Sequence, residues 1–164
     1  MKIFIKNKLV SFGGSSVATN ESGETVFKIK GKWTLFSPTR KKKIFDKDGK
    51  LLFVVRNKWL NFWNHRAYIF DANKQKIATV KDIVRVSNGA KYVVEGYKDE
   101  ISFDGKFFGG TLNILSNGTK IGTLVQDFNI VRDSFSLEAD ENEIAFLTAL
   151  VIAIDNINDK RTKN

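Results

Sequence analysis

A chain of 164 residues suits one domain with a buried core, because typical domains contain about 100 to 200 residues. Hydrophobic residues make up 42% of the sequence, including 14 Phe and 3 Trp, which excludes the intrinsically disordered class. The absence of cysteine excludes disulfides, thiolate zinc sites and thiol nucleophiles. We therefore expect a single domain over residues 1–164 that folds by packing alone in the cytoplasm.

The formal net charge of +9 is distributed unevenly along the chain. Residues 28–58 contain eleven basic and two acidic side chains, whereas residues 127–159 contain one basic and eight acidic side chains. The folded molecule is therefore expected to carry a strong charge dipole.

The N-terminal segment, residues 1–8, is interrupted by lysines every few residues. It lacks the apolar core of about 7 to 15 residues that a signal peptide requires. Secretion by that route is not expected.

A hairpin unit recurs along the chain, with a polar turn followed by a strand. Gly, Asn and Asp in the turns supply the positive φ that tight turns need, and several of the strands alternate apolar with polar residues. We read this pattern as a meander of antiparallel hairpins. The turns are residues 20–24, 46–50, 71–75 and 116–120, and the strands that follow them are residues 25–30, 51–56, 77–81 and 121–126.

The C-terminal region changes from the strand pattern to a helix, predicted at about residues 140–156. Asp140 and Glu143 have capping-box spacing, and an uncharged apolar run follows from Ile144 to Ile154. This run is too short for a transmembrane segment, which needs about 20 residues. Because the helix has no polar face, it has to be surrounded by protein. The predicted fold is mainly β, a closed antiparallel barrel of about twelve strands enclosing one hydrophobic C-terminal α-helix.

The chain resembles the LURP-one-related family of the tubby C-terminal-like superfamily over nearly its whole length. The most specific segment is Arg132-Asp133-Ser134-Phe135-Ser136-Leu137-Glu138, followed by residues 149–157; residues 45–51 and 105–109 support it. The resemblance implies a twelve-stranded barrel around a hydrophobic C-terminal helix. Tubby domains of the same superfamily bind phosphoinositide headgroups, so the resemblance also suggests a lipid ligand. No lipid-site motif of the superfamily can be matched to residues of this sequence, so this suggestion rests on the fold alone.

Catalytic groups are sparse, and we expect no enzyme activity, cofactor or metal. His65 lies in a predicted loop without metal-ligand spacing or an activated serine motif, so a solvated or structural role is favoured. Residues 13–16 lack the Lys-Ser/Thr ending of a phosphate-binding loop. The acids Asp140, Glu141 and Glu143 lack calcium-loop spacing and are explained by helix capping.

The basic run Arg40-Lys41-Lys42-Lys43, with the basic residues around it, is the feature of the sequence that predicts binding. Anionic membranes attract Lys and Arg, and nearby aromatic rings can anchor at the headgroup level. We predict a non-catalytic binding or scaffold module, monomeric, with weak peripheral affinity for anionic phospholipid. The predicted contacts are Lys32, Arg40, Lys41, Lys42, Lys43 and Lys58, beside Trp33, Phe36, Trp59, Phe62 and Trp63.

Two alternatives stay open for the basic run. In the first, the run is only a solvated face beside core aromatic residues, and the barrel binds a protein partner that the sequence does not identify. In the second, the run binds nucleic acid. Nucleic acid is less favoured, because no nucleic-acid motif is present and the acidic C-terminal third would repel phosphates. Exposure of Trp33, Trp59 and Trp63 beside the lysines would distinguish a binding surface from a core.

Overall fold

The structure, a computed structural model, describes residues 1–6, 15–31, 41–58, 65–83, 91–107, 110–127 and 134–161. These segments contain twelve β-strands and one α-helix. The strands are β1 (Lys2–Lys6), β2 (Ser15–Asn20), β3 (Thr25–Gly31), β4 (Lys42–Asp46), β5 (Leu51–Asn57), β6 (Arg66–Asp71), β7 (Lys76–Ile83), β8 (Lys91–Glu95), β9 (Ile101–Gly105), β10 (Thr111–Ser116), β11 (Thr119–Asp127) and β12 (Ser134–Ala139), and the helix is α1 (Ile144–Arg161).

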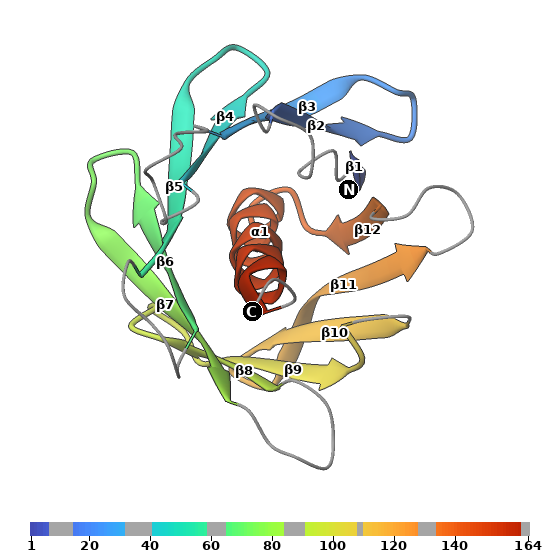
Figure 1. The fold of residues 1–164 in the computed structure, drawn as a ribbon. Helices are drawn as coiled ribbons and strands as arrows, with labels where there is room; N and C mark the ends of the chain where they lie inside the picture. Colours follow the sequence, from blue (N-terminus) through green and yellow to red (C-terminus); the bar gives the residue numbers. More distant parts are fainter. Residues whose placement is uncertain are drawn as a thin grey trace.

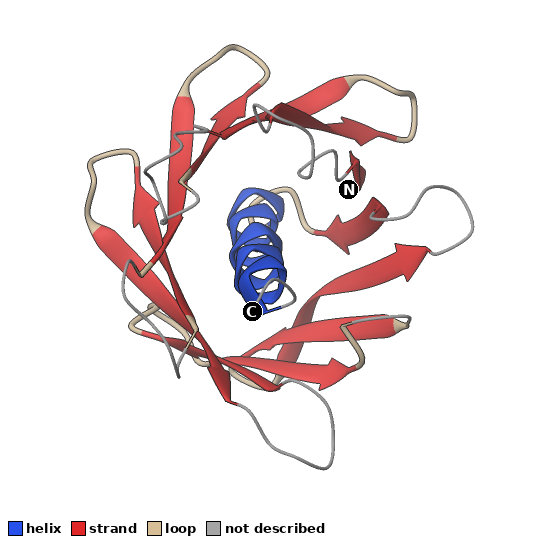
Figure 2. Ribbon diagram, in the orientation of Figure 1, coloured by secondary structure: helices blue, strands red, loops and turns tan. Residues whose placement is uncertain are grey.

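All twelve strands belong to one antiparallel sheet with the order β8-β7-β6-β5-β4-β3-β2-β1-β12-β11-β10-β9. The sheet curls around α1, which lies inside the ring of strands (Figure 1). Colouring by secondary structure shows the same arrangement, a blue helix surrounded by red strands (Figure 2). The predicted fold is confirmed, and the four expected strands correspond to β3, β5, β7 and β11.

The two ends of the sequence meet in the sheet, because β1 pairs with β12 as well as with β2. The N-terminal amine of Met1 donates a 2.7 Å hydrogen bond to the Ala139 oxygen. The Ala139 nitrogen donates in return to the Met1 oxygen at 2.9 Å. This pairing brings β12 beside the first strand.

Three hairpin turns share one hydrogen-bond pattern that the sequence repeat indicated. The Oδ1 atoms of Asn20, Asp46 and Asp71 each accept a hydrogen bond from the main-chain nitrogen four residues later, at 2.9, 2.8 and 2.8 Å. A side chain that substitutes for a backbone acceptor in this way is typical of Asx turns. Short polar turns therefore join β2 to β3, β4 to β5 and β6 to β7.

The fourth residue of each of these turns has positive φ. Gly23 has a φ of 83° and Gly49 one of 88°, which glycine adopts without a steric penalty. The third copy has Lys74 at this position, with a φ of 67°. The positive φ is therefore set by the turn geometry and not by the residue type.

The helix α1 starts and ends later than the predicted segment 140–156. Residues 141–143 form a turn, in which the Asp140 oxygen accepts hydrogen bonds from the nitrogens of Glu143 and Ile144, both at 3.0 Å. Every side chain from Phe146 to Asn158 is buried. A helix enclosed on all sides explains why its sequence has no polar face over most of its length.

The sheet is nearly closed, with one seam between β8 and β9. Within the described residues, no backbone pairing joins these two strands. Aromatic side chains cover the seam from inside: Tyr92 contacts Phe103 edge-on at 6.5 Å, and Tyr97 stacks on Phe146 of α1 at 3.8 Å. Packing thus replaces the missing ladder hydrogen bonds.

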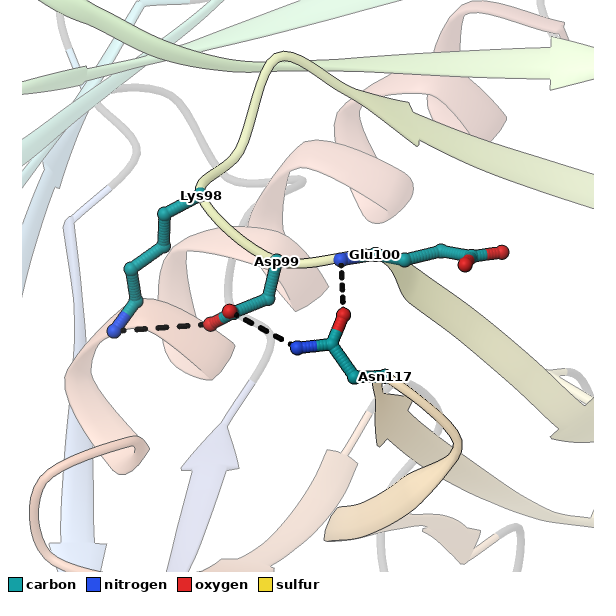
Figure 3. A network of polar contacts seen from close by, with 4 residues as sticks. All are labelled: Lys98, Asp99, Glu100 and Asn117. Atoms are coloured by element: carbon teal, nitrogen blue, oxygen red, sulfur yellow. Dashed lines mark hydrogen bonds and ion pairs between the residues drawn. The ribbon is translucent and has the colours of Figure 1, made fainter.

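The turn that joins β8 to β9 is held by Asn117 in the turn between β10 and β11 (Figure 3). Asn117 Nδ2 donates to Asp99 Oδ1 at 3.1 Å, and Asn117 Oδ1 accepts from the Glu100 nitrogen at 3.0 Å. Lys98 Nζ lies 3.7 Å from Asp99 Oδ2. This network holds in place the turn at the end of the seam where β8 and β9 are connected.

Candidate anion-binding surface

The outward side of β3, β4 and β5 carries exposed cations, here called the basic face and defined by Lys28, Lys30, Lys41, Lys43 and Arg56. Alternation of side chains along a strand produces it, because the inward neighbours Ile29, Ile44 and Val55 fill the core. The basic face is therefore the solvent side of a half-buried sheet.

Lys30 and Lys43 lie directly opposite each other on β3 and β4. Cross-strand partners have Cβ atoms about 4.5 to 5.5 Å apart, and like charges in this position are destabilising. Lys30, Lys43 and Arg56 form no ion pair with any described residue. The positive charge of the basic face is consequently available to an external anion.

Two aromatic rings on this side lie beneath cations. Lys30 Nζ is 5.4 Å from the centre of the Phe45 ring, and Arg56 Cζ is 4.6 Å from the centre of the Phe70 ring. Phe45 and Phe70 are half-buried. Cation–π attraction holds the charges over the rings, so these rings do not present a free face to solvent.

The structure places some of the predicted contact residues on the outer surface of the barrel and one of them in its interior. Lys41, Lys43 and Lys58 are exposed, whereas Lys42 is only 8% exposed and faces the barrel interior. The two-residue period of β4 puts Lys42 on the opposite side from its neighbours. The continuous run of basic residues in the sequence is therefore not a continuous surface. Lys32 and Arg40 lie outside the described residues, as do Trp33, Phe36, Trp59, Phe62 and Trp63.

Sequence reasoning did not select Lys28, Lys30 and Arg56 for the contact surface. The alternation of Phe27-Lys28-Ile29-Lys30 contains the required signal, since Lys28 and Lys30 share one face of a strand. Lys28 Nζ donates a 2.9 Å hydrogen bond to the Lys47 oxygen, which ties it to the turn between β4 and β5. Lys30, Lys43 and Arg56 are thus the central charges of the basic face.

The barrel interior contains a polar group around the second half of α1. Asn57 Nδ2 donates to the Asn156 oxygen at 2.9 Å, and the Tyr92 hydroxyl donates to Asn158 Oδ1. Buried polar groups are normally satisfied in this way, so a structural role for this group is sufficient. The buried polar side chains on the inward side of the strands are Ser16, Lys42, Asn57, Asp82 and Gln126.

His65, the only histidine, is half-buried immediately before β6. Its main-chain oxygen accepts a hydrogen bond from the Asp82 nitrogen at 3.1 Å. Among the described residues, no three His, Asp or Glu side chains are grouped to hold a metal ion. In the same part of the chain, no helix combines the length and apolar character that crossing a membrane requires.

Comparisons with known proteins agree with the fold. A family model described as LURP-one-related matches residues 1–155. A crystal structure of an Arabidopsis thaliana protein superimposes with a TM-score of 0.65 at 17% sequence identity, covering 96% of this chain and 90% of the plant protein. No curated protein sequence matches this chain. The family model covers most of the sequence, and the chain therefore belongs to the LURP-one-related family.

Proposed function

We propose that this protein is a non-catalytic binding module that docks weakly on anionic phospholipid surfaces through its basic face. Membership of the LURP-one-related family favours a binding module over an enzyme. The observation that carries the lipid proposal is the direct opposition of Lys30 and Lys43, two exposed lysines without an acidic partner among the described residues. The proposal includes residues 1–164 as one monomeric domain in the cytoplasm.

The proposed lipid contacts include residues whose exposure the structure describes and residues that are expected from the sequence alone. Lys30, Lys41, Lys43 and Arg56 would make the central contacts, and Lys58 is exposed at the end of β5. Lys32 and Arg40 remain in the proposal as expectations from sequence. Lys42 does not contribute, because a charge inside the barrel cannot reach a headgroup.

The energetics favour weak and salt-dependent docking. A basic side chain near an anionic surface contributes about 1 kcal/mol, so a few exposed cations suffice for measurable binding. Screening shortens the reach of these charges from about 30 Å at 0.01 M salt to about 8 Å at 0.15 M.

A membrane surface suits this face better than single-stranded nucleic acid does. Nucleic-acid-binding sheets stack bases on open aromatic rings. On this face, Phe45 and Phe70 are covered by Lys30 and Arg56. Headgroup phosphates need only the outward charges, which are exposed.

Vesicle co-sedimentation tests the proposal with phosphatidylcholine vesicles and with vesicles that also contain phosphatidylserine, at low and physiological salt. We expect binding only to the anionic vesicles and weaker binding at the higher salt. The double substitution Lys30→Gln and Lys43→Gln should weaken binding about thirtyfold, since it removes two charges worth about 1 kcal/mol each.

A matched control removes two charges elsewhere. Lys106 and Lys120 are exposed near β9 and on β11. Lys106→Gln with Lys120→Gln changes the net charge equally but leaves the basic face intact. Equal loss of binding in both double variants would show that only net charge matters, and no binding of the wild type to anionic vesicles would refute the proposal.

A further inference from the structure

The turn between β10 and β11 consists of Asn117 and Gly118, which have φ values of 48° and 79°. Ser116 and Thr119, on either side of the turn, are register partners. A two-residue hairpin turn with positive φ at both central residues is a type I′ turn, for which Asn-Gly is a preferred sequence. Both residues are exposed. The hairpin therefore presents an Asn-Gly pair to solvent.

An asparagine followed by glycine is prone to lose ammonia without an enzyme, because glycine has no side chain to obstruct the attacking nitrogen. In this reaction, the Gly118 main-chain nitrogen gives its proton to a solvent base and bonds to Asn117 Cγ. The Cγ–Nδ2 bond breaks, and ammonia leaves after Nδ2 takes a proton from solvent. Water then opens the cyclic imide at one of its two carbonyl carbons, which leaves aspartate or isoaspartate at position 117. Water is the one co-reactant, and nothing is oxidised or reduced.

Asn117 also holds the connection between β8 and β9 (Figure 3). Its main-chain nitrogen donates to the Glu100 oxygen at 2.8 Å, and its Oδ1 accepts from the Glu100 nitrogen at 3.0 Å. Its Nδ2 donates to Asp99 Oδ1 at 3.1 Å. These three hydrogen bonds, here called the Asn117 contact, extend the β9–β10 pairing beyond Ile101 and Ser116. The reactive side chain therefore takes part in the closure of the barrel.

The seam between β8 and β9 depends on a small number of contacts. No backbone pairing joins the two strands in the part of the chain that the structure describes. Tyr97, in the connection between them, stacks on Phe146 of α1 at 3.8 Å. The Asn117 contact restrains the same connection from the β10–β11 turn. Loss of this contact should therefore increase opening of the seam more than opening of the paired strands.

The Asn117 contact opposes the loss of ammonia while it is formed. Imide formation requires the Gly118 nitrogen to lie on the same side as the Asn117 side chain. A type I′ turn has a ψ of about +30° at its first central residue, which directs the next nitrogen away from that side chain. Rotation of the side chain toward Gly118 would also break the bonds of Oδ1 and Nδ2. The reaction therefore proceeds from the conformation in which the contact is broken.

The product of the reaction cannot restore the Asn117 contact. An aspartate at this position has no N–H group to donate to Asp99, and it places a second carboxylate beside Asp99 Oδ1. Lys98 Nζ lies 3.7 Å from the other oxygen, Asp99 Oδ2, and compensates only part of this repulsion. An isoaspartate adds a methylene group to the main chain, which is incompatible with a two-residue turn. Each product therefore leaves the connection between β8 and β9 less restrained.

We propose that Asn117 is a deamidation site, at which a transient break of the Asn117 contact becomes a permanent loosening of the β8–β9 seam. The reactant is water, and the reaction requires no enzyme. This site does not depend on the proposed membrane docking, which relies on Lys30 and Lys43 on other strands.

Peptide mass spectrometry tests the site on the full chain, incubated at mildly alkaline pH in buffer and in urea. Asn117 and Asn88, the asparagines of the two Asn-Gly pairs in the sequence, fall in separate tryptic peptides, residues 107–120 and 86–91. Asn88 lies outside the described residues and verifies the chemistry in the unfolded chain. We expect Asn117 to deamidate in both conditions, at least about tenfold more slowly in buffer, because the contact has to break first. Equal rates in the two conditions, or no deamidation of Asn117 in buffer, would overturn the proposal.

Substitution of Asp99 tests whether the Asn117 contact controls the rate. Asp99→Ala removes the acceptor of Nδ2, so Asn117 should deamidate about fivefold faster in buffer and at the wild-type rate in urea. Asp104 is exposed on β9, opposite Asn113. Asp104→Ala is therefore the matched control, because it removes the same charge but leaves the Asn117 contact intact, and it should react as the wild type does. Wild-type rates in Asp99→Ala, or the same acceleration in both variants, would refute the proposal.

Hydrogen exchange measures the consequence for the seam. Protein deamidated at Asn117, and the variant Asn117→Asp, should exchange the amides of β8 and β9 about fivefold faster than the wild type, with β3, β4 and β5 unchanged. Asn73→Asp, in the exposed turn between β6 and β7, adds the same charge and should leave the seam unchanged. Wild-type exchange in β8 and β9 of Asn117→Asp, or an equal increase in all strands, would show that the site does not control the seam.

Discussion

Asn57 on β5 donates a hydrogen bond of 2.9 Å from its side-chain nitrogen to the main-chain oxygen of Asn156 in α1, across 99 residues of sequence. Asn57 is 2% exposed, so this bond forms in the barrel interior, where an unpaired polar group is costly. It connects the wall of the barrel to the second half of the helix.

Replacing Asn57 by Ala should lower the free energy of unfolding by about 1 to 3 kcal/mol, because the hydrogen bond is lost in a buried site. Urea denaturation measures the change, with Asn142→Ala in the exposed turn before α1 as the control. If both variants have the same stability, the Asn57 bond does not anchor the helix.

Leu150 lies at the centre of α1 and is fully buried. Leu150→Asp should prevent folding, because it places an unpaired charge inside the barrel. Leu150→Ala should cost about 2 to 5 kcal/mol through the cavity it leaves, and Leu150→Met less than about 1.5 kcal/mol. Circular dichroism and thermal melting test this order. A folded Leu150→Asp variant with unchanged melting would contradict an enclosed helix.

Gly122 on β11 allows the sheet to approach α1 closely. A Cβ atom at this position would lie 2.6 Å from Leu147 Cδ1 and 3.2 Å from the Glu138 oxygen. Gly122→Ala should destabilise the protein by about 1 to 3 kcal/mol through overpacking.

A double-mutant cycle identifies the clash behind the Gly122 effect. Leu147→Ala removes the obstructing methyl group, so Gly122→Ala should cost less in that background. Purely additive effects in the unfolding free energy would place the cause elsewhere.

Tyr97, which stacks on Phe146 of α1 at the seam, should make the free energy of unfolding depend on pH in the alkaline range. Burial, with the nearby carboxylates of Glu143 and Asp99, raises the pKa of Tyr97 to about 12. An unfolded tyrosine has a pKa of about 10. Between these values the folded state keeps a proton that the unfolded state releases, so stability is complete below about pH 10 and falls as the pH rises toward 12.

Tyr97→Phe removes the titrating hydroxyl and keeps the ring stacked on Phe146. The variant should lose less stability than the wild type between pH 10 and 12, as measured by urea denaturation at each pH. Parallel pH profiles for the two proteins would show that Tyr97 does not cause the alkaline loss.

The barrel and its central helix were predictable from sequence because each depends on local patterns. Asn20, Asp46 and Asp71 start polar turns at similar spacing, and the strands between them alternate. The run from Ile144 to Ile154 is apolar on every side, which requires enclosure. The exact ends of α1 were less predictable, because the Asp140 carbonyl closes a tight turn before the helix starts.

The basic surface was only partly predictable. Lys41, Lys42 and Lys43 are adjacent in sequence, yet the strand period places Lys42 inside the barrel. Lys30 and Lys43 become neighbours only through the pairing of β3 with β4. No local pattern specifies that register, because bulges elsewhere in the sheet, such as the one between Ile44 and Phe45, shift the pairing by one residue.

The sequence by itself determined the fold class, the hairpin turns and the burial of the C-terminal helix, because turn chemistry and hydrophobic periodicity act over a few residues. Only the tertiary structure decided which cations face each other. The opposition of Arg66 and Lys81 depends on the register of β6 and β7. Register arises from long-range pairing and core packing, so charge neighbours across a sheet cannot be derived from their separation along the chain.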